Sequence, residues 1–181
     1  MPLPEIATLT AMFNGGAFQP FIDYIRFPYF RNLEQNTRIE FTFPLSVFVG
    51  QNGCGKSSAL QAMYGCPLGK SVGDYWFNTT VDPIVEMRGG DRNCLIYSYG
   101  GGGAGREVLK TRIAKRGKPD LWDTSEPLAR YGMDPNAART KPVEKNVVYL
   151  NFRAGHSAFE KAFHEETPPG SGVQEFLRHR S

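Results

Sequence analysis

The residues best suited to chemistry form one glycine-rich segment, Gly50-Gln51-Asn52-Gly53-Cys54-Gly55-Lys56-Ser57. It fits the pattern GxxxxGK[ST], in which glycines let the backbone point successive N–H groups at bound phosphates. We expect the Lys56 ammonium to reach the β- and γ-phosphates and the Ser57 hydroxyl to be a ligand of Mg²⁺. The segment therefore predicts a site for ATP and Mg²⁺.

A strand, a loop and a helix must follow one another for such a segment to work. Residues 45–49 are a mostly apolar run typical of a buried strand, and residues 56–64 favour a helix that Gly65 and Pro67 end. This order supports the phosphate-binding interpretation over a turn without function. Cys54 is interpreted as a small side chain of the loop, because neither His nor Cys lies near it in the sequence.

The rest of the chain predicts an α/β fold with a β-rich antiparallel subdomain. Expected strands cover residues 22–27, 38–43, 94–99, 108–114 and 147–150, the last returning to the core sheet. The glycine run 100–105 is interpreted as a hairpin connection, and residues 117–146 as a loop or insertion. We expect a nucleotide-binding lobe over 1–164, with the β-rich insertion at about 75–146. Residues 165–181 are expected to form a linker and the start of a following helix.

Composition narrows the class of protein. A chain of 181 residues with 40% hydrophobic residues can bury one core, and a net charge of +3 does not by itself indicate nucleic-acid binding. The three cysteines are an odd number and lie far apart, so they predict neither a disulfide framework nor a zinc site. No signal peptide or membrane-spanning run is evident. We expect a cytoplasmic protein without a membrane partner.

Three segments in a fixed order carry a family resemblance: Phe30-Arg31-Asn32, then Ile39-Glu40-Phe41, then residues 47–58 with the pair Asn52-Gly53. This order resembles the N-terminal lobe of the ABC-type ATPase head of SMC, RecF and OLD-like proteins, a group of AAA-family P-loop ATPases. The resemblance implies a P-loop NTPase fold. The nucleotide-binding residues that it implies are Arg31, Asn32, Gly50, Asn52, Gly53, Cys54, Gly55, Lys56, Ser57 and Ser58. A solvated turn is the alternative for Arg31 and Asn32.

Hydrolysis in this family also needs a second lobe. The sequence contains no Asp-Glu pair of the kind that ends a Walker B strand, and the run Ser98-Tyr99-Gly100-Gly101 is interpreted as hairpin rather than signature segment. We therefore expect this chain to bind ATP and to hydrolyse it negligibly alone, with the catalytic residues unknown. The alternatives are a non-hydrolysing ATP-binding subunit of a complex and a P-loop small-molecule kinase.

Partners are implied by the resemblance. They include a homodimer or larger complex formed through the heads, nucleic acid and an effector nuclease subunit, with DNA processing or anti-phage defence as the coupled activity. Residues 106–118 carry six Lys and Arg against the single acid Glu107. We interpret this stretch either as a nucleic-acid-facing hairpin or, preferably, as a solvated edge strand protected by its charges.

Overall fold

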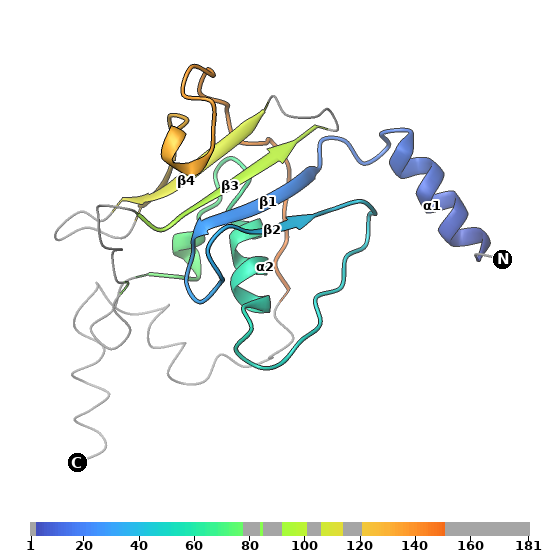
Figure 1. The fold of residues 1–181 in the computed structure, drawn as a ribbon. Coiled ribbons are helices and arrows are strands. Elements are labelled where there is room, and N and C mark those ends of the chain that lie inside the picture. The colour runs from blue at the N-terminus through green and yellow to red at the C-terminus, as the bar shows by residue number, and fades with distance from the viewer. Residues whose placement is uncertain (1–2, 78–83, 85–91, 101–105, 114–120, 151–181) are drawn as a thin grey trace, which may run out of the picture.

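The computed structural model describes residues 3–77, 84, 92–100, 106–113 and 121–150. Within them, five strands form one antiparallel sheet in the order β2-β1-β3-β4-β5 (Figure 1). The strands are β1 (Ile22–Tyr29), β2 (Thr37–Glu40), β3 (Cys94–Tyr99), β4 (Glu107–Ile113) and β5 (Leu121–Ser125). The helices are α1 (Pro4–Asn14) and α2 (Lys56–Tyr64), with the short 3-10 turns η1 (Val72–Asp74) and η2 (Ala129–Tyr131). The sheet and helices together form an α/β fold.

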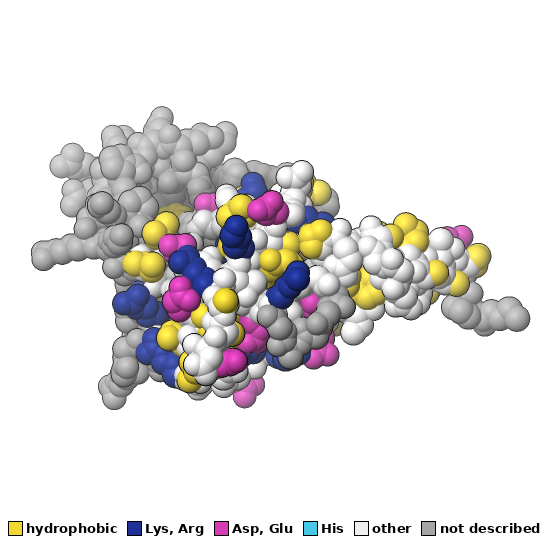
Figure 2. Space-filling view, turned by 90° about the horizontal axis from the view of Figure 1, so that it is seen from above, with side chains coloured by type: hydrophobic (Ala, Val, Ile, Leu, Met, Phe, Trp, Pro, Cys, Tyr) yellow, Lys and Arg dark blue, Asp and Glu magenta, His cyan; other side chains and the backbone are white. Residues whose placement is uncertain are grey.

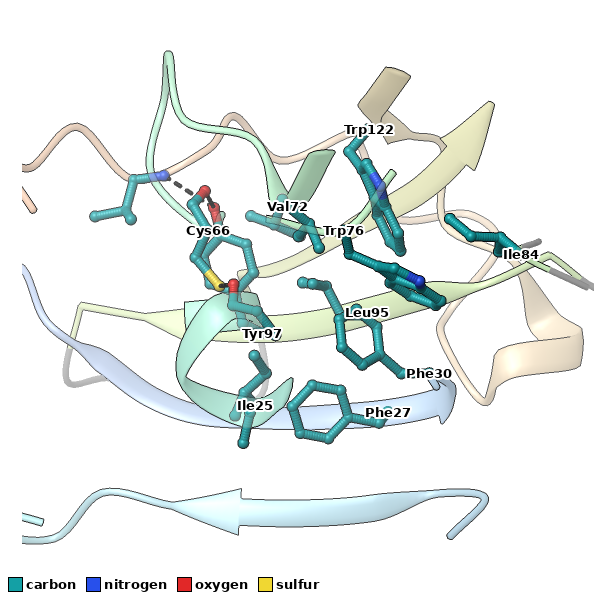
Figure 3. Packing of buried hydrophobic residues seen from close by; sticks show 14 residues of the cluster. Ile25, Phe27, Phe30, Cys66, Val72, Trp76, Ile84, Leu95, Tyr97 and Trp122 are labelled. Carbon is teal, nitrogen blue, oxygen red and sulfur yellow. Dashed lines mark hydrogen bonds between the residues drawn. The ribbon is translucent and has the colours of Figure 1, made fainter. Parts of the chain in front are cut away.

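The main core lies between α2 and one face of the sheet. Alternate residues of β1 and β3 point toward α2, because successive side chains of a strand lie on opposite faces. They include Ile25 and Tyr97, both fully buried (Figure 3). Phe30, Trp76 and Trp122 pack beside them with ring centroids 5.0 to 5.6 Å apart. These aromatic contacts join the turn after β1, the segment after η1 and strand β5.

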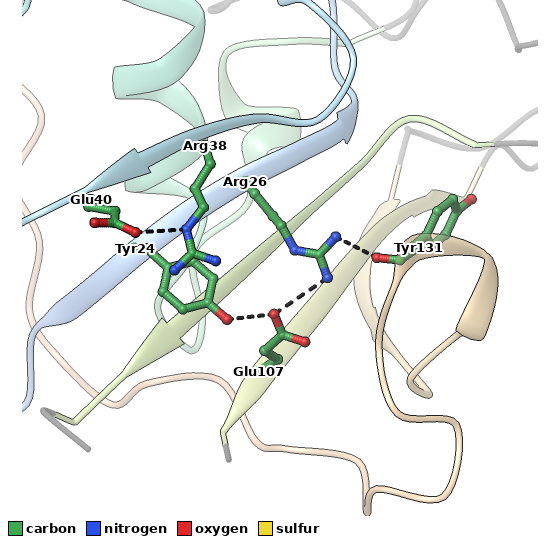
Figure 4. Close-up of polar contacts among 6 residues, drawn as sticks. All are labelled: Tyr24, Arg26, Arg38, Glu40, Glu107 and Tyr131. Carbon is green, nitrogen blue, oxygen red and sulfur yellow. Dashed lines mark hydrogen bonds and ion pairs between the residues drawn. The ribbon is translucent and has the colours of Figure 1, made fainter. Parts of the chain in front are cut away.

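A polar cluster occupies part of the opposite face of the sheet (Figure 4). The Tyr24 hydroxyl donates to Oε1 of Glu107 at 2.5 Å, and Arg26 lies 3.4 Å from the same oxygen. The guanidinium of Arg38 stacks 3.7 Å from the centroid of the Tyr24 ring. Burial, followed by the bond to Glu107, raises the pKa of Tyr24 to about 12. The cluster joins β2, β1 and β4 across the sheet.

Helix α1 extends away from the sheet, and none of its residues is buried (Figures 1 and 2). Phe13 connects α1 to the residue before β1, because its ring centroid lies 4.6 Å from that of Phe21. None of the helices formed by the described residues has the length and apolar character needed to cross a bilayer. On the face seen in Figure 2, the described Lys and Arg residues are mixed with Asp and Glu, so these residues form no continuous basic patch.

Several predicted elements are confirmed. The strands expected at 22–27, 94–99 and 108–114 correspond to β1, β3 and β4, and the helix expected at 56–64 is α2. The strand expected at 38–43 is the shorter β2. Strand β5 lies inside the region that we interpreted as a loop or insertion. Residues 101–105 and 151–181, including the expected linker and helix start, lie outside the described residues.

Two predicted strands are wrong. Residues 45–49 and 147–150 form no strand, and their apolar side chains are exposed, as in Val47 at 75%, Val49 at 84% and Val148 at 78%. The physical reason is that no described strand lies beside either run to pair with its backbone. The two runs instead line a cleft of about 610 Å³ together with α2. Its lining includes Phe43, Leu45, Phe48, Leu60, Val148 and Tyr149.

Residues 106–118 were interpreted as a nucleic-acid-facing hairpin or as a solvated edge strand. Both interpretations are wrong for Lys110 and Arg112. Strand β4 lies between β3 and β5, so it is not an edge strand. Lys110 and Arg112 are 4% and 2% exposed, because β4 turns both side chains to the core face. Neither side chain is available to face solvent or a nucleic acid. Residues 114–120 lie outside the described residues.

Candidate functional site

The glycine loop, residues 50–57, leads directly into helix α2. Gly50, Gly53 and Gly55 have φ angles of 153°, 86° and 93°, in the region that favours glycine. At Gly55 the requirement is also steric, since a Cβ there would collide with Cδ2 of Leu33. A side chain at that position would therefore strain the backbone and displace the end of the Leu33 side chain.

The N-terminus of α2 offers free backbone donors to the loop. Gly55 is the residue before the helix, and no side chain caps the helix there. The first N–H groups of a helix have no partner within it, and together they carry the positive end of the helix dipole. Such an end attracts anions, phosphates above all.

Lys56 folds back over the loop. Its ammonium donates to the carbonyl oxygens of Gly50 and Gln51, each at 2.8 Å, and lies 3.6 Å from Sγ of Cys54. Lys56 is the first residue of α2, so these exposed bonds hold its charge against the loop that precedes the helix. Gln51, Asn52, Cys54 and Ser57 are exposed as well. A phosphate in this position would meet an ammonium, a hydroxyl and backbone N–H groups together.

Asn32 supports the loop from the turn that follows β1. Its side-chain amide donates to the carbonyl of Gly53, and its Oδ1 lies 3.3 Å from the Ser58 hydroxyl that donates to it. Ser58 is 7% exposed, so it faces the interior rather than the open side of the loop. The structure therefore brings Asn32, Gly53 and Ser58 together, as residues that hold the loop in shape.

Arg31 lies against the side of α2 instead of over the loop. Its guanidinium donates to Oε1 of Gln61 at 2.7 Å and to the carbonyl of Tyr75 at 3.4 Å, and it lies 4.7 Å from the centroid of the Trp76 ring. The φ angle of Arg31 is 50°, a left-handed conformation that is uncommon for residues other than glycine. Arg31 thus anchors the helix that carries Lys56.

Sequence reasoning missed the supporting residues Leu33, Gln61 and Trp76. Leu33 fills the space beneath Gly55, whereas Gln61 and Trp76 receive the Arg31 side chain. No local pattern marks the last two, because they become partners of Arg31 only when the turn packs on α2. Leu33 could have been found from the sequence, because it is an apolar residue directly after Asn32.

The donor set fits a Mg²⁺-bound triphosphate. Among the described residues, no group of three or more His, Cys, Asp and Glu side chains gathers to hold a metal ion. Ser57 supplies one hydroxyl, which suits an ion that takes its other ligands from phosphates and water. The exposed ammonium and the uncapped helix end suit the phosphates themselves.

Comparison with known proteins gives two matches. Residues 25–108 match the model of the AAA domain family. The DNA replication and repair protein RecF of Clostridium kluyveri is 41% identical over 51 residues, which are 28% of this chain and 14% of that protein. The aligned part therefore spans about one seventh of the relative's length. No solved structure matches the chain. Together, the two matches support a resemblance to the N-terminal portion of an SMC/RecF-like AAA ATPase.

Proposed function

We propose that the glycine loop binds the triphosphate of Mg²⁺-ATP and that the chain contributes this site to a P-loop ATPase of the SMC/RecF type. The observation that supports the proposal is that three kinds of donor converge on one loop. They are the Lys56 ammonium, the Ser57 hydroxyl and the uncapped N-terminus of α2. The AAA match covers the same residues and supports the proposal independently.

Each residue has a separate task in this proposal. Lys56 exchanges its two carbonyl acceptors for oxygens of the β- and γ-phosphates. Ser57 offers its hydroxyl to Mg²⁺, which neutralises charge on the same oxygens when it is bound. Asn32 keeps the loop open from beneath, and Arg31 keeps α2 in place. The loop thereby presents its donors without reorganisation of the sheet.

The exposed apolar runs beside the cleft support a second part of the proposal. Residues 45–49 and 147–150 have the composition of buried strands but expose Val47, Val49 and Val148. We propose that strands of a complementary lobe pair with these runs and complete the ATPase, either in the same protein or in a second chain. That lobe would supply the carboxylate that orients water for hydrolysis.

The coupled activity is proposed from the relative. RecF is named for DNA replication and repair, so we propose that ATP binding here serves a nucleic-acid-directed activity. Pairing of two ATP-bound heads is part of this proposal. It predicts ATP-dependent dimerisation of the full-length protein in light scattering, and a change in ATP turnover on addition of DNA. A mass and a turnover rate that ignore both ligands would contradict it.

Calorimetric titration with Mg²⁺-ATP tests the binding site. Lys56→Ala removes the ammonium, so the dissociation constant should rise about tenfold or more, the scale of a charge-assisted hydrogen bond. Lys141→Ala is the matched control, because it removes an exposed ammonium elsewhere and should leave binding unchanged. Equal affinity of the wild type and Lys56→Ala would overturn the assignment.

A further inference from the structure

The segment that follows α2, residues 65–70, is fastened to the sheet by one buried cation. The Lys110 ammonium on β4 donates to the carbonyl of Gly65 and lies 3.3 Å from the carbonyl oxygens of both Pro67 and Lys70. All three acceptors belong to the turn that ends α2. An ammonium has three protons to donate, so this turn satisfies the whole group.

A second strand holds the same turn. The Tyr97 hydroxyl on β3 donates to the carbonyl of Cys66 at 2.7 Å and accepts from the backbone N–H of Val143 at 3.2 Å (Figure 3). Gly65 packs so closely on Val72 that a Cβ there would strike the backbone nitrogen of Val72 at 2.7 Å. The end of α2 is therefore fixed from β3, β4 and η1 together.

Burial makes this arrangement costly. Lys110 is 4% exposed, and desolvation lowers its pKa from the ordinary value. The titratable groups that act on it are Cys66 and Asp123. A well-packed apolar side chain would fill the same space without the desolvation cost. An apolar side chain could not make directional bonds. The Lys110 ammonium bonds to three carbonyl oxygens and so holds the C-terminal, negative end of the α2 dipole at one position on β4.

We infer that Lys110 is a positioning residue for the glycine loop, acting through helix α2. The inference rests on the proposed function and extends it to a residue remote from the loop. Helix α2 has nine residues. Its two ends are therefore about 12 Å apart at 1.5 Å per residue. Because a short helix moves as a rod, a shift at Gly65 displaces Lys56 and Ser57 at the other end. Gly55, the residue before the helix, lies against Leu33, so a displaced helix end also changes this contact at the loop.

The test compares Lys110→Met with Leu109→Ala in the full-length protein. Leu109 is the neighbouring residue on β4, is 1% exposed and packs on the opposite face of the sheet, away from α2. Both variants lose buried interactions, but only the first releases the turn after α2. The readouts are amide hydrogen exchange of residues 53–59 and the dissociation constant for a fluorescent ATP analogue with Mg²⁺. Both are measured at a temperature where each variant is folded.

Lys110→Met should raise exchange at residues 53–59 and weaken nucleotide binding about fivefold to tenfold, about 1 to 1.4 kcal/mol. Leu109→Ala should leave both readouts as in the wild type. Unchanged exchange and affinity in Lys110→Met, or equal changes in both variants, would overturn the inference. If Lys110→Met does not fold, the milder Lys110→Gln is judged by the same criteria. A wild-type protein that binds no nucleotide would refute the proposed function, and the exchange data would still decide the role of Lys110.

Discussion

The guanidinium of Arg31 donates to Oε1 of Gln61 at 2.7 Å, so the turn after β1 is bonded directly to the middle of α2. The same guanidinium lies over the ring of Trp76. Arg31 therefore joins three parts of the chain that are far apart in the sequence. The contact helps to position the glycine loop, because it orients helix α2, whose first residue is Lys56.

Removing the contact between Arg31 and Gln61 should lower stability more than it lowers ligand affinity. Each single substitution to Ala should reduce the free energy of unfolding by about 1 to 2 kcal/mol, the scale of a hydrogen bond to a charged group. In a double-mutant cycle measured by urea unfolding, the two losses should fall short of additivity by about 1 kcal/mol. Fully additive losses would show that the two side chains do not act together.

Gly55→Ala and Gly53→Ala should differ, although both glycines have a left-handed φ. A Cβ at Gly53 meets nothing within 4 Å, whereas one at Gly55 collides with Leu33. We expect a loss of about 1 kcal/mol from backbone strain alone in Gly53→Ala. Gly55→Ala should lose more, and Leu33→Ala in the same chain should recover part of the difference. Thermal unfolding measures all of these, and equal losses in the two single variants would contradict the steric argument.

Ser57→Ala should change the dependence of nucleotide binding on Mg²⁺. The hydroxyl is exposed beside Lys56 and is proposed to bind the metal only when a triphosphate is present. Titrations of ATP with and without Mg²⁺ should show that the metal strengthens binding in the wild type and has a smaller effect in Ser57→Ala. The nucleotide-free protein should bind Mg²⁺ weakly. Tight Mg²⁺ binding without ATP would point to a metal site elsewhere.

Stability should fall as the pH rises above 9. Burial raises the pKa of the Cys66 thiol from 9.0 to about 12, with the nearby Lys110 charge acting in the opposite direction. The folded protein therefore keeps this proton where the unfolded chain loses it, so the stabilisation is complete below pH 9 and is lost between pH 9 and 12. In Cys66→Ala the urea midpoint should decline less steeply over this window.

Tyr24 contributes to the same decline, because its pKa is also raised to about 12. Tyr24→Phe is therefore the control that separates the two groups. The lowered pKa of Lys110 has the opposite sign and makes stability rise with pH below its ordinary value of 10.5. A slope in Cys66→Ala identical to that of the wild type would show that the thiol is not the group responsible.

Local patterns predicted the parts of the site that depend on local geometry. The glycines, Lys56 and Ser57 define a loop and a helix start through their own backbone preferences, and β1, β3 and β4 follow from short apolar runs. Strand β5 was missed because Leu121–Ser125 sits in a segment rich in Pro, Asp and Lys, although Trp122 and Thr124 alternate toward the core.

The errors arose where the partner of a residue lies far away in the sequence. An apolar run such as 45–49 indicates burial, but whether it is buried depends on a neighbouring strand that no local pattern can show. The reverse holds for Lys110, whose charge indicated a solvated surface. Its acceptors at residues 65–70 are brought to it only by the packing of α2 on the sheet.

The bonds from Lys56 to the carbonyls of Gly50 and Gln51 mean that the loop already contains a substitute for its ligand. Two backbone carbonyl oxygens accept the hydrogen bonds of the Lys56 ammonium that phosphate oxygens would accept in the proposed complex. In the proposed function, nucleotide binding exchanges one set of oxygens for another, so its enthalpy should be smaller than the number of new contacts suggests. The same two bonds hold the ammonium in place while no nucleotide is bound, so the proposed site does not have to order this side chain first.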